Sequence, residues 1–178
     1  ILVFFDEAYF EFAKRKDYPD TIQLLRKYKN IIVTRTFSKM YGLAGLRIAY
    51  GIAEENLIKE LESKKLPFSI NVMAVPAALA ALEDEEFVTK CAALNTIERK
   101  NIFNEFKKLG YNTIPTHSNF LYVYFNELNE KESFLEELSQ SGFMVRPMDI
   151  FGNEKALRIS VGTHEQNRKL IDFLVKNQ

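Results

Sequence analysis

Two apolar runs decide the fold: Ile1–Phe5 (ILVFF) and, after a helical segment, Ile31–Val33 (IIV). The segment between them, Thr21–Tyr28, carries apolar residues at helical spacing. A continuous apolar run without polar alternation is typical of a strand that is covered on both faces. A strand, a helix and a second strand in this order form a βαβ crossover with parallel strands. The sequence therefore predicts an α/β fold with a mostly parallel sheet.

The remaining pattern predicts further elements and a second lobe. An Ala-rich helix over Ser69–Leu82 is expected to kink or divide at Pro76, because proline cannot donate a helical hydrogen bond. The other expected helices cover Glu54–Lys64, Glu85–Leu109 with Gly110 as its stop, Lys131–Ser141, and a closing segment capped by Thr163 and Gln166. The other expected strands cover Leu46–Ile52, Phe120–Phe125, Phe143–Arg146 and Ala156–Val161. We expect residues 1–68 to be part of a large domain, 69–110 connecting helices, and 111–178 a small α+β lobe.

Composition argues against several classes of protein. The 178 residues include 24 basic and 24 acidic ones, so no net field attracts nucleic acid or an anionic membrane. The longest nearly apolar stretch, Val72–Leu82, is too short to span a bilayer. Cys91 has no partner for an internal disulfide, which predicts a small buried residue in a reducing compartment such as the cytoplasm. His117 and His164 lack metal-ligand spacing, so no metal site is expected.

Residues with chemical potential follow both apolar runs. Asp6 is the first polar residue after the first run, and open α/β sheets bind ligands at the carboxyl ends of their strands. Lys39 follows the second run and is an amine nucleophile if its surroundings lower its pKa. Thr36, Ser38 and Arg47 add two hydroxyls and a guanidinium, which together suit a phosphate. The alternatives are a turn cap at Asp6, a solvated Lys39, and local backbone bonding by the hydroxyls.

These blocks resemble a known family. Ile1–Tyr9, Arg35–Lys39 (RTFSK) and Gly42–Arg47 (GLAGLR) are similar to the cofactor-binding half of the fold-type I, class I/II aminotransferases, most closely the histidinol-phosphate aminotransferases. The resemblance continues through Asn119–Leu121 and Val145–Arg146 to Leu157–Thr163. The resemblance therefore extends from the first residues of the chain through its C-terminal lobe.

The resemblance implies a pyridoxal 5'-phosphate (PLP) site. Lys39 would hold PLP as an internal aldimine and shuttle the substrate proton. Asp6 would pair with the pyridinium nitrogen and Tyr9 with the ring oxygen. The cofactor phosphate would be bound by Thr36, Ser38 and Arg47. The substrate's carboxylate or phosphate would be bound by Arg158, assisted by Arg146; the alternative is that each arginine pairs with an acidic residue of its own lobe.

The implied function is amino-group transfer between L-histidinol phosphate and 2-oxoglutarate, in histidine biosynthesis, by a cytoplasmic homodimer that acts on small amino and keto acids. An aromatic amino-acid aminotransferase and a phosphothreonine-type decarboxylase are alternatives on the same scaffold. A nucleotide hydrolase, with Asp6-Glu7 holding Mg²⁺ and water, and a non-catalytic interaction module are alternatives from other classes. Family members carry further cofactor residues upstream of the matched blocks, so the chain alone is expected to be an inactive C-terminal fragment.

Overall fold

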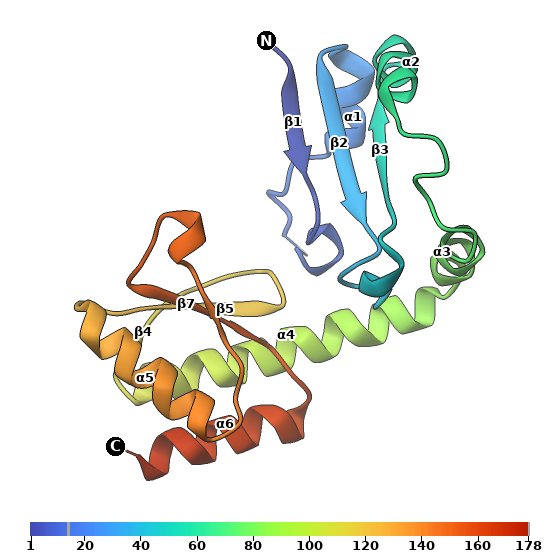
Figure 1. Cartoon of the computed structure of the whole chain (residues 1–178). Coiled ribbons are helices and arrows are strands. Elements are labelled where there is room, and N and C mark those ends of the chain that lie inside the picture. Colours follow the sequence, from blue (N-terminus) through green and yellow to red (C-terminus); the bar gives the residue numbers. More distant parts are fainter. Residues whose placement is uncertain (14, 178) are drawn as a thin grey trace. The chain divides into compact units, whose positions relative to one another are not determined.

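The computed structural model describes residues 1–13 and 15–177 and contains two compact units (Figure 1). The first unit is Ile1–Ala92 and the second is Ala93–Gln178. The helix α4 (Glu85–Lys108) begins in the first unit and ends in the second, as its apolar spacing predicts. The division expected at residues 68 and 110 stays a prediction.

The first unit contains a small mixed sheet with the order β1-β2-β3 (Figure 1). The strands β1 (Val3–Asp6) and β2 (Ile31–Thr36) are parallel, and α1 (Thr21–Lys27) connects them, which confirms the predicted crossover. Asp20 caps α1 by accepting the N–H of Gln23. Phe4 on β1 is 60% exposed, so the described residues do not cover both faces of this apolar strand.

The third strand differs from the prediction. β3 (Ala49–Ala53) pairs antiparallel with β2, with Ala49 opposite Thr36, so the sheet is not mostly parallel. The regular structure in this connection, residues 37–48, is the short 3-10 helix Ala44–Leu46, whereas parallel neighbours are usually joined by an α-helix that crosses the sheet. The helix α2 (Glu55–Lys64) follows β3 as expected.

The expected kink at Pro76 is wrong. The helix α3 (Ala74–Glu83) begins two residues before this proline, which therefore lies in the first turn. The N–H groups of a first turn have no helical acceptor, so a proline there removes nothing. The side chain of Asn71 accepts the N–H groups of Met73 and Ala74 and thereby fixes the start of the helix.

The second unit is an antiparallel sheet with helices on one face (Figure 1). Its strand order is β4-β5-β7-β6, formed by Asn112–Ile114, Phe120–Tyr124, Ala156–Ser160 and Arg146–Pro147. Its core joins α4, α5 (Leu128–Gln140) and α6 (His164–Lys176) to the inner face of the sheet. The fully buried members include Ile102, Phe106, Leu121, Val123, Leu138 and Leu157.

Local hydrogen bonds explain where the second unit departs from prediction. α5 begins at Leu128 rather than Lys131, because Glu127 and Glu130 form a capping box. The capping box of Thr163 and Gln166 is confirmed. Of the strand expected over Phe143–Arg146, only Arg146 is in a strand, and the short strand β4 was not expected.

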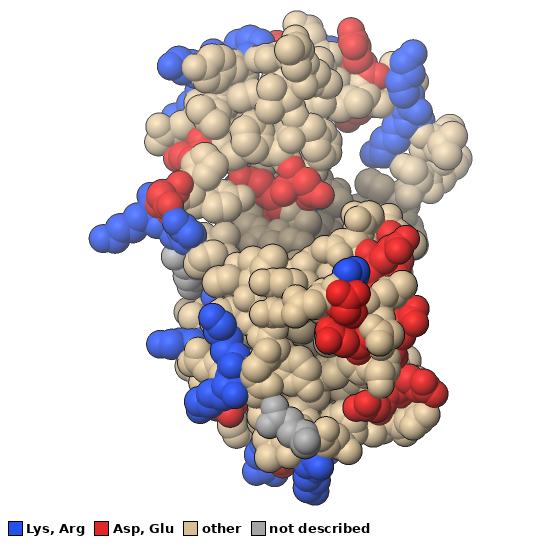
Figure 2. All heavy atoms as spheres, turned by 90° about the vertical axis from the view of Figure 1, so that its left-hand side faces the viewer, with Lys and Arg blue, Asp and Glu red and all other residues tan. Residues whose placement is uncertain are grey.

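Surface charge and helix apolarity bear on whether the chain has a charged partner or a membrane partner. The face in Figure 2 carries both acidic and basic side chains, and neither kind covers it alone. Among the residues that the structure describes, no helix combines the length and apolarity needed to cross a membrane. Cys91 is half-buried, and this burial raises the pKa of its thiol.

Candidate active site

The first unit brings the acid and the amine predicted from sequence to one end of its sheet. Asp6 ends β1 and lies opposite Thr34 of β2, and β2 then runs on toward Lys39. The Lys39 Nζ atom lies 5.6 Å from the centre of the Tyr9 ring, which belongs to the turn after β1. The Asp6 Oδ1 atom accepts the N–H of Ala8 at 3.1 Å, so the turn cap expected as an alternative is present. It uses one oxygen of the carboxylate, and the second makes no hydrogen bond within the described part of the chain.

The three groups predicted for phosphate binding also lie together. The N–H of Ser38 donates to Thr36 Oγ1 at 3.1 Å, and Arg47 Nη1 lies 3.5 Å from Ser38 Oγ. The same guanidinium donates to the carbonyl of Ala44 at 3.0 Å. Within residues 1–13 and 15–177, Arg47 makes no ion pair. The local backbone bonding expected as an alternative is therefore present at Thr36, beside the contact of Ser38 with Arg47.

Arg47 has a strained backbone. Its φ angle is 52°, in the left-handed region that side chains other than glycine rarely adopt. Such strain persists where the surrounding structure imposes it, often at a functional site. Here the conformation turns the chain from Leu46 into β3 and leaves the guanidinium beside Ser38.

Buried neighbours fix the loop that carries Lys39. Phe37 packs with Tyr41, Ile48 and Tyr50, and its N–H donates to the carbonyl of Ile48 at 3.2 Å. Met40 packs in a separate buried cluster. The loop is thus held on both sides of Lys39.

Sequence reasoning missed a buried ion pair beside these residues. Arg35 Nε donates to Glu7 Oε2 at 2.8 Å, and the Glu7 side chain is 2% exposed. Thr21 Oγ1 and Tyr18 Oη donate to the other oxygen at 2.9 and 3.4 Å. The signal in the sequence is a charged residue inside the otherwise apolar and β-branched β2, since a buried charge needs a partner. Because Glu7 is engaged in this way, it does not present its carboxylate to a metal and water, as the hydrolase interpretation requires.

In the second unit, the two predicted arginines are neighbours on adjacent strands. Arg146 of β6 lies opposite Arg158 of β7. The Arg158 guanidinium carbon lies 5.0 Å from the centre of the Phe120 ring, and that of Arg146 lies 5.5 Å from the Phe151 ring. In the described part of the chain neither arginine forms an ion pair, so the expected alternative of pairing within their own lobe is absent. Like charges directly opposite in a sheet repel, and a bound anion offsets that repulsion.

The two histidines have structural surroundings. His164 Nδ1 lies 3.0 Å from Glu98 Oε1, and Asn167 donates to the other oxygen of Glu98 at 2.9 Å. The hydrogen bond from Asn167, and to a smaller extent the contact with His164, lowers the pKa of the Glu98 carboxyl. The carbonyl of His117 accepts a hydrogen bond from Arg99 at 3.0 Å.

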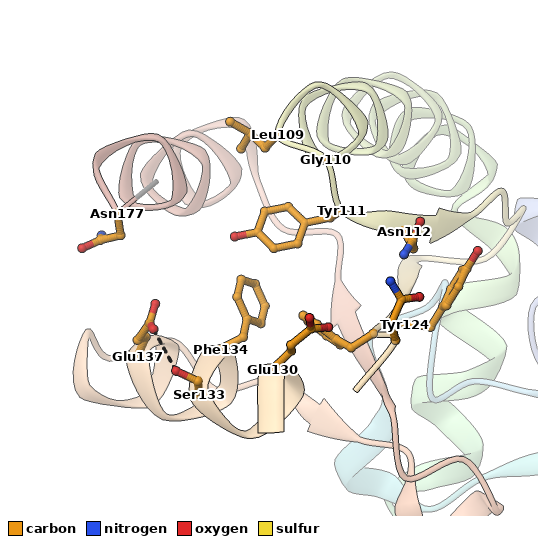
Figure 3. A pocket seen from close by; sticks show the side chains of 12 residues that line it. Leu109, Gly110, Tyr111, Asn112, Tyr124, Glu130, Ser133, Phe134, Glu137 and Asn177 are labelled. Atoms are coloured by element: carbon orange, nitrogen blue, oxygen red, sulfur yellow. Dashed lines mark hydrogen bonds between the residues drawn. The ribbon is translucent and has the colours of Figure 1, made fainter. Parts of the chain in front are cut away.

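A cavity of about 490 Å³ in the second unit contains none of the predicted site residues. Figure 3 shows the Tyr111 ring, the Phe134 ring and the carboxylates of Glu130 and Glu137 around it. Burial, followed by the charge of Glu137, raises the pKa of Tyr111.

The sequence matches the family of class I and II aminotransferases over residues 1–174. The chain belongs to that family. This membership agrees with the presence of the predicted lysine, acid and hydrogen-bond donors in the first unit, and it replaces the interpretation as a nucleotide hydrolase.

Named relatives lie within the same family. The chain is 44% identical over 177 residues to histidinol-phosphate aminotransferase 2 of Carboxydothermus hydrogenoformans, covering 98% of this chain and 48% of the relative. It is 38% identical over 176 residues to histidinol-phosphate aminotransferase of Bacillus subtilis (strain 168), covering 99% and 48%. A solved structure with a TM-score of 0.87 and 27% identity is histidinol-phosphate aminotransferase from Sinorhizobium meliloti in complex with pyridoxal-5'-phosphate, covering 99% of this chain and 50% of that one. The chain spans about half the length of the curated relatives it matches.

Proposed function

We propose that the full-length polypeptide containing this chain is a PLP-dependent aminotransferase that transfers an amino group between L-histidinol phosphate and 2-oxoglutarate. The observation that carries the proposal is the approach of Lys39 Nζ to the Tyr9 ring, at the strand end that also holds Asp6. The names of the relatives support the substrate pair.

The residues of the first unit fit PLP chemically. When bound, PLP supplies an electron sink for the charge that develops at the substrate α-carbon. Lys39 is the amine that would hold the cofactor covalently and carry the proton removed from that carbon. The Asp6 carboxylate would keep the pyridine nitrogen protonated, because an anion beside a cationic acid favours the charged form. Tyr9 would donate to the ring oxygen.

The phosphate end of the cofactor fits the donors on the β2–β3 connection. Thr36 and Ser38 supply hydroxyls and Arg47 supplies a cation, with Ser38 and Arg47 already 3.5 Å apart. Charge-assisted hydrogen bonds to phosphate are stronger than neutral ones, so this cluster would account for much of the cofactor affinity. These donors also anchor the ring end indirectly, because they lie on the same short loop as Lys39.

The substrate site is proposed at Arg158 and Arg146. A guanidinium fork binds a carboxylate or a phosphate with two parallel hydrogen bonds, so Arg158 suits both glutamate and histidinol phosphate. A second arginine at the paired position of the neighbouring strand would favour a doubly charged phosphate over a carboxylate. This charge count supports histidinol phosphate over an unphosphorylated aromatic amino acid.

Borohydride trapping tests the cofactor site. The full-length protein is incubated with PLP, reduced with borohydride and digested, and the modified peptide is identified by mass. We expect the added mass on Lys39, loss of the yellow colour on reduction, and no adduct at that position in Lys39→Ala. A matched control, Lys29→Ala, removes a lysine from the exposed end of the same crossover and keeps the adduct. An adduct confined to other lysines contradicts the proposal.

Substrate profiling tests the substrate. Rates are compared with histidinol phosphate, phenylalanine and tyrosine as amino donors to 2-oxoglutarate, and carbon dioxide release is measured with phosphothreonine. We expect the highest kcat/KM with histidinol phosphate. A preference for the aromatic amino acids, or decarboxylation of phosphothreonine, would establish one of the two alternatives on this scaffold.

We also propose that the full-length protein is a homodimer. Exposed apolar side chains gather on the segment before α3 and on α3 itself: Leu66, Phe68, Val72, Met73, Val75 and Leu79. Exposed apolar side chains that form a patch mark interaction sites, and these residues would supply one at a subunit interface. Sedimentation of the full-length protein tests this, and a monomer at all concentrations contradicts it.

A further inference from the structure

Glu7 and Arg35 form a buried ion pair whose role the proposed function leaves open. The two side chains are 2% and 15% exposed, and 2.8 Å separates Arg35 Nε from Glu7 Oε2. Thr21 and Tyr18 donate to the remaining oxygen. Both carboxylate oxygens of Glu7 are therefore occupied by neighbours within the first unit.

Stability alone is a weak reason for such a pair. Removing two charges from water is costly, and replacing a buried ion pair by apolar residues is often neutral or stabilising. The pair also holds its charge firmly. Burial lowers the pKa of Arg35, but hydrogen bonds to Glu7 and Tyr50 outweigh it, so the pKa is raised overall.

The pair lies next to two of the residues that the proposed function assigns to the cofactor, one on each strand. Glu7 directly follows Asp6, and Arg35 directly precedes Thr36. The N–H of Glu7 donates to the carbonyl of Thr34 at 2.9 Å, so the pairing of β1 with β2 extends past Asp6. Because successive side chains on a strand point to opposite faces, the ion pair lies on the face opposite to Asp6 and Thr36.

Arg35 also joins the other elements around this end of the sheet. Its guanidinium carbon lies 3.7 Å from the centre of the Phe10 ring, in the turn after β1 that also carries Tyr9. Tyr50 lies opposite Arg35 on β3. One guanidinium thus ties the β1 turn to β2 and β3.

We propose that Glu7 and Arg35 are positioning residues, whose ion pair fixes the separation between Asp6 and Lys39 that the cofactor must bridge. This inference rests on the proposed function. In this role neither residue would contact the cofactor or the substrate, because protein neighbours engage both carboxylate oxygens of Glu7. A misplacement of about 1 Å in a catalytic group lowers rates by about 100-fold, so loss of the pair affects the chemical step more than substrate binding.

The test uses Glu7→Gln in the full-length protein, with Ile31→Ala as the matched control. Ile31 is buried at the far end of the same strand, so its truncation also destabilises β2 but leaves the ion pair intact. For each protein, bound PLP is measured by absorbance and fixed by borohydride, kcat is expressed per bound cofactor, and unfolding is followed in urea. The residual rate thus reports geometry and not the fraction folded.

We expect Glu7→Gln to lower kcat per bound cofactor by roughly 10- to 100-fold, with KM for the amino donor within about twofold of the original. Ile31→Ala should lower the urea midpoint and keep kcat per bound cofactor. Should Glu7→Gln not fold, Thr21→Val removes one donor to Glu7 at similar volume, and we expect a smaller loss of kcat in the same direction.

Two results overturn the inference in distinguishable ways. Equal kcat per bound cofactor in the Glu7→Gln and unsubstituted proteins, or an equal fall in Ile31→Ala, overturns the positioning role alone. An unsubstituted protein that forms no adduct at Lys39 overturns both this role and the proposed function.

Discussion

Arg146→Gln separates the phosphate-binding role of the paired arginines from any role in folding. The substitution removes one of two arginines that occupy paired positions on β6 and β7. Relief of like-charge repulsion across a sheet stabilises by about 0.2–1 kcal/mol. Loss of the cation–π contact with Phe151 costs about 0.5–1 kcal/mol at an exposed site. The two effects nearly cancel, so the free energy of unfolding should change by less than about 0.5 kcal/mol.

The effect on substrate is much larger. A hydrogen bond to a charged group contributes about 1.5–3 kcal/mol, which corresponds to a loss of about 10- to 150-fold in kcat/KM for histidinol phosphate. For an amino donor without a phosphate, Arg158 remains available, and the loss should stay below about threefold. The ratio of the two kcat/KM values is therefore the quantity to measure, by steady-state kinetics at low ionic strength and again at about 1 M salt, where screening is strong.

Lys155→Gln is the matched control for this substitution. It removes the same charge from the loop before β7, where Lys155 pairs with Glu127 at 3.6 Å. It should leave the substrate ratio unchanged. Equal losses for phosphorylated and unphosphorylated donors in Arg146→Gln, or an equal change in Lys155→Gln, would refute the assignment of Arg146 to the phosphate.

Three further predictions concern the cofactor loop and the second unit. Arg47→Gly should weaken PLP binding by about 10-fold or more in an absorbance titration, because a charged donor to the phosphate is lost. The free energy of unfolding of the cofactor-free protein should change by less than about 1 kcal/mol, because relief of left-handed strain offsets the entropy cost of glycine. A large fall in that free energy would contradict this prediction. Hydrogen bonds from Asn167 and then His164 lower the pKa of Glu98 from 4.5, so the unfolded state binds more protons than the folded state in acid. The stability that this group contributes is present above about pH 4.5 and is lost as the pH falls through the folded pKa. In urea unfolding, Asn167→Ala should therefore lose less of its free energy of unfolding between neutral and acidic pH. Phe106→Ala should lower the free energy of unfolding by about 3–5 kcal/mol in the same assay, because the side chain is fully buried, and a loss below 1 kcal/mol would contradict its place in the core.

Local signals in the sequence were sufficient where short-range contacts determine the structure. The capping box of Thr163 and Gln166 and the stop at Gly110 were found because the deciding atoms lie within a few residues of each other. The error at Pro76 has a related cause. Proline is disruptive inside a helix and harmless in its first turn, and the start of α3 is set by Asn71, whose capping role the apolar pattern does not show.

The cluster of Thr36, Ser38 and Arg47 could be predicted because a single turn gathers them, although their binding role stays a prediction. The ion pair of Glu7 and Arg35 could not, because it depends on the register of two strands that are distant in sequence. A shift of one residue in that register would turn Arg35 to the other face of the sheet and leave the Glu7 carboxylate without its cation. The same register places Asp6 beside Thr34, from which the chain reaches Lys39 in five residues. A chain that pairs β1 with β2 in this register therefore places Asp6 on one face of the sheet and the ion pair of Glu7 and Arg35 on the other.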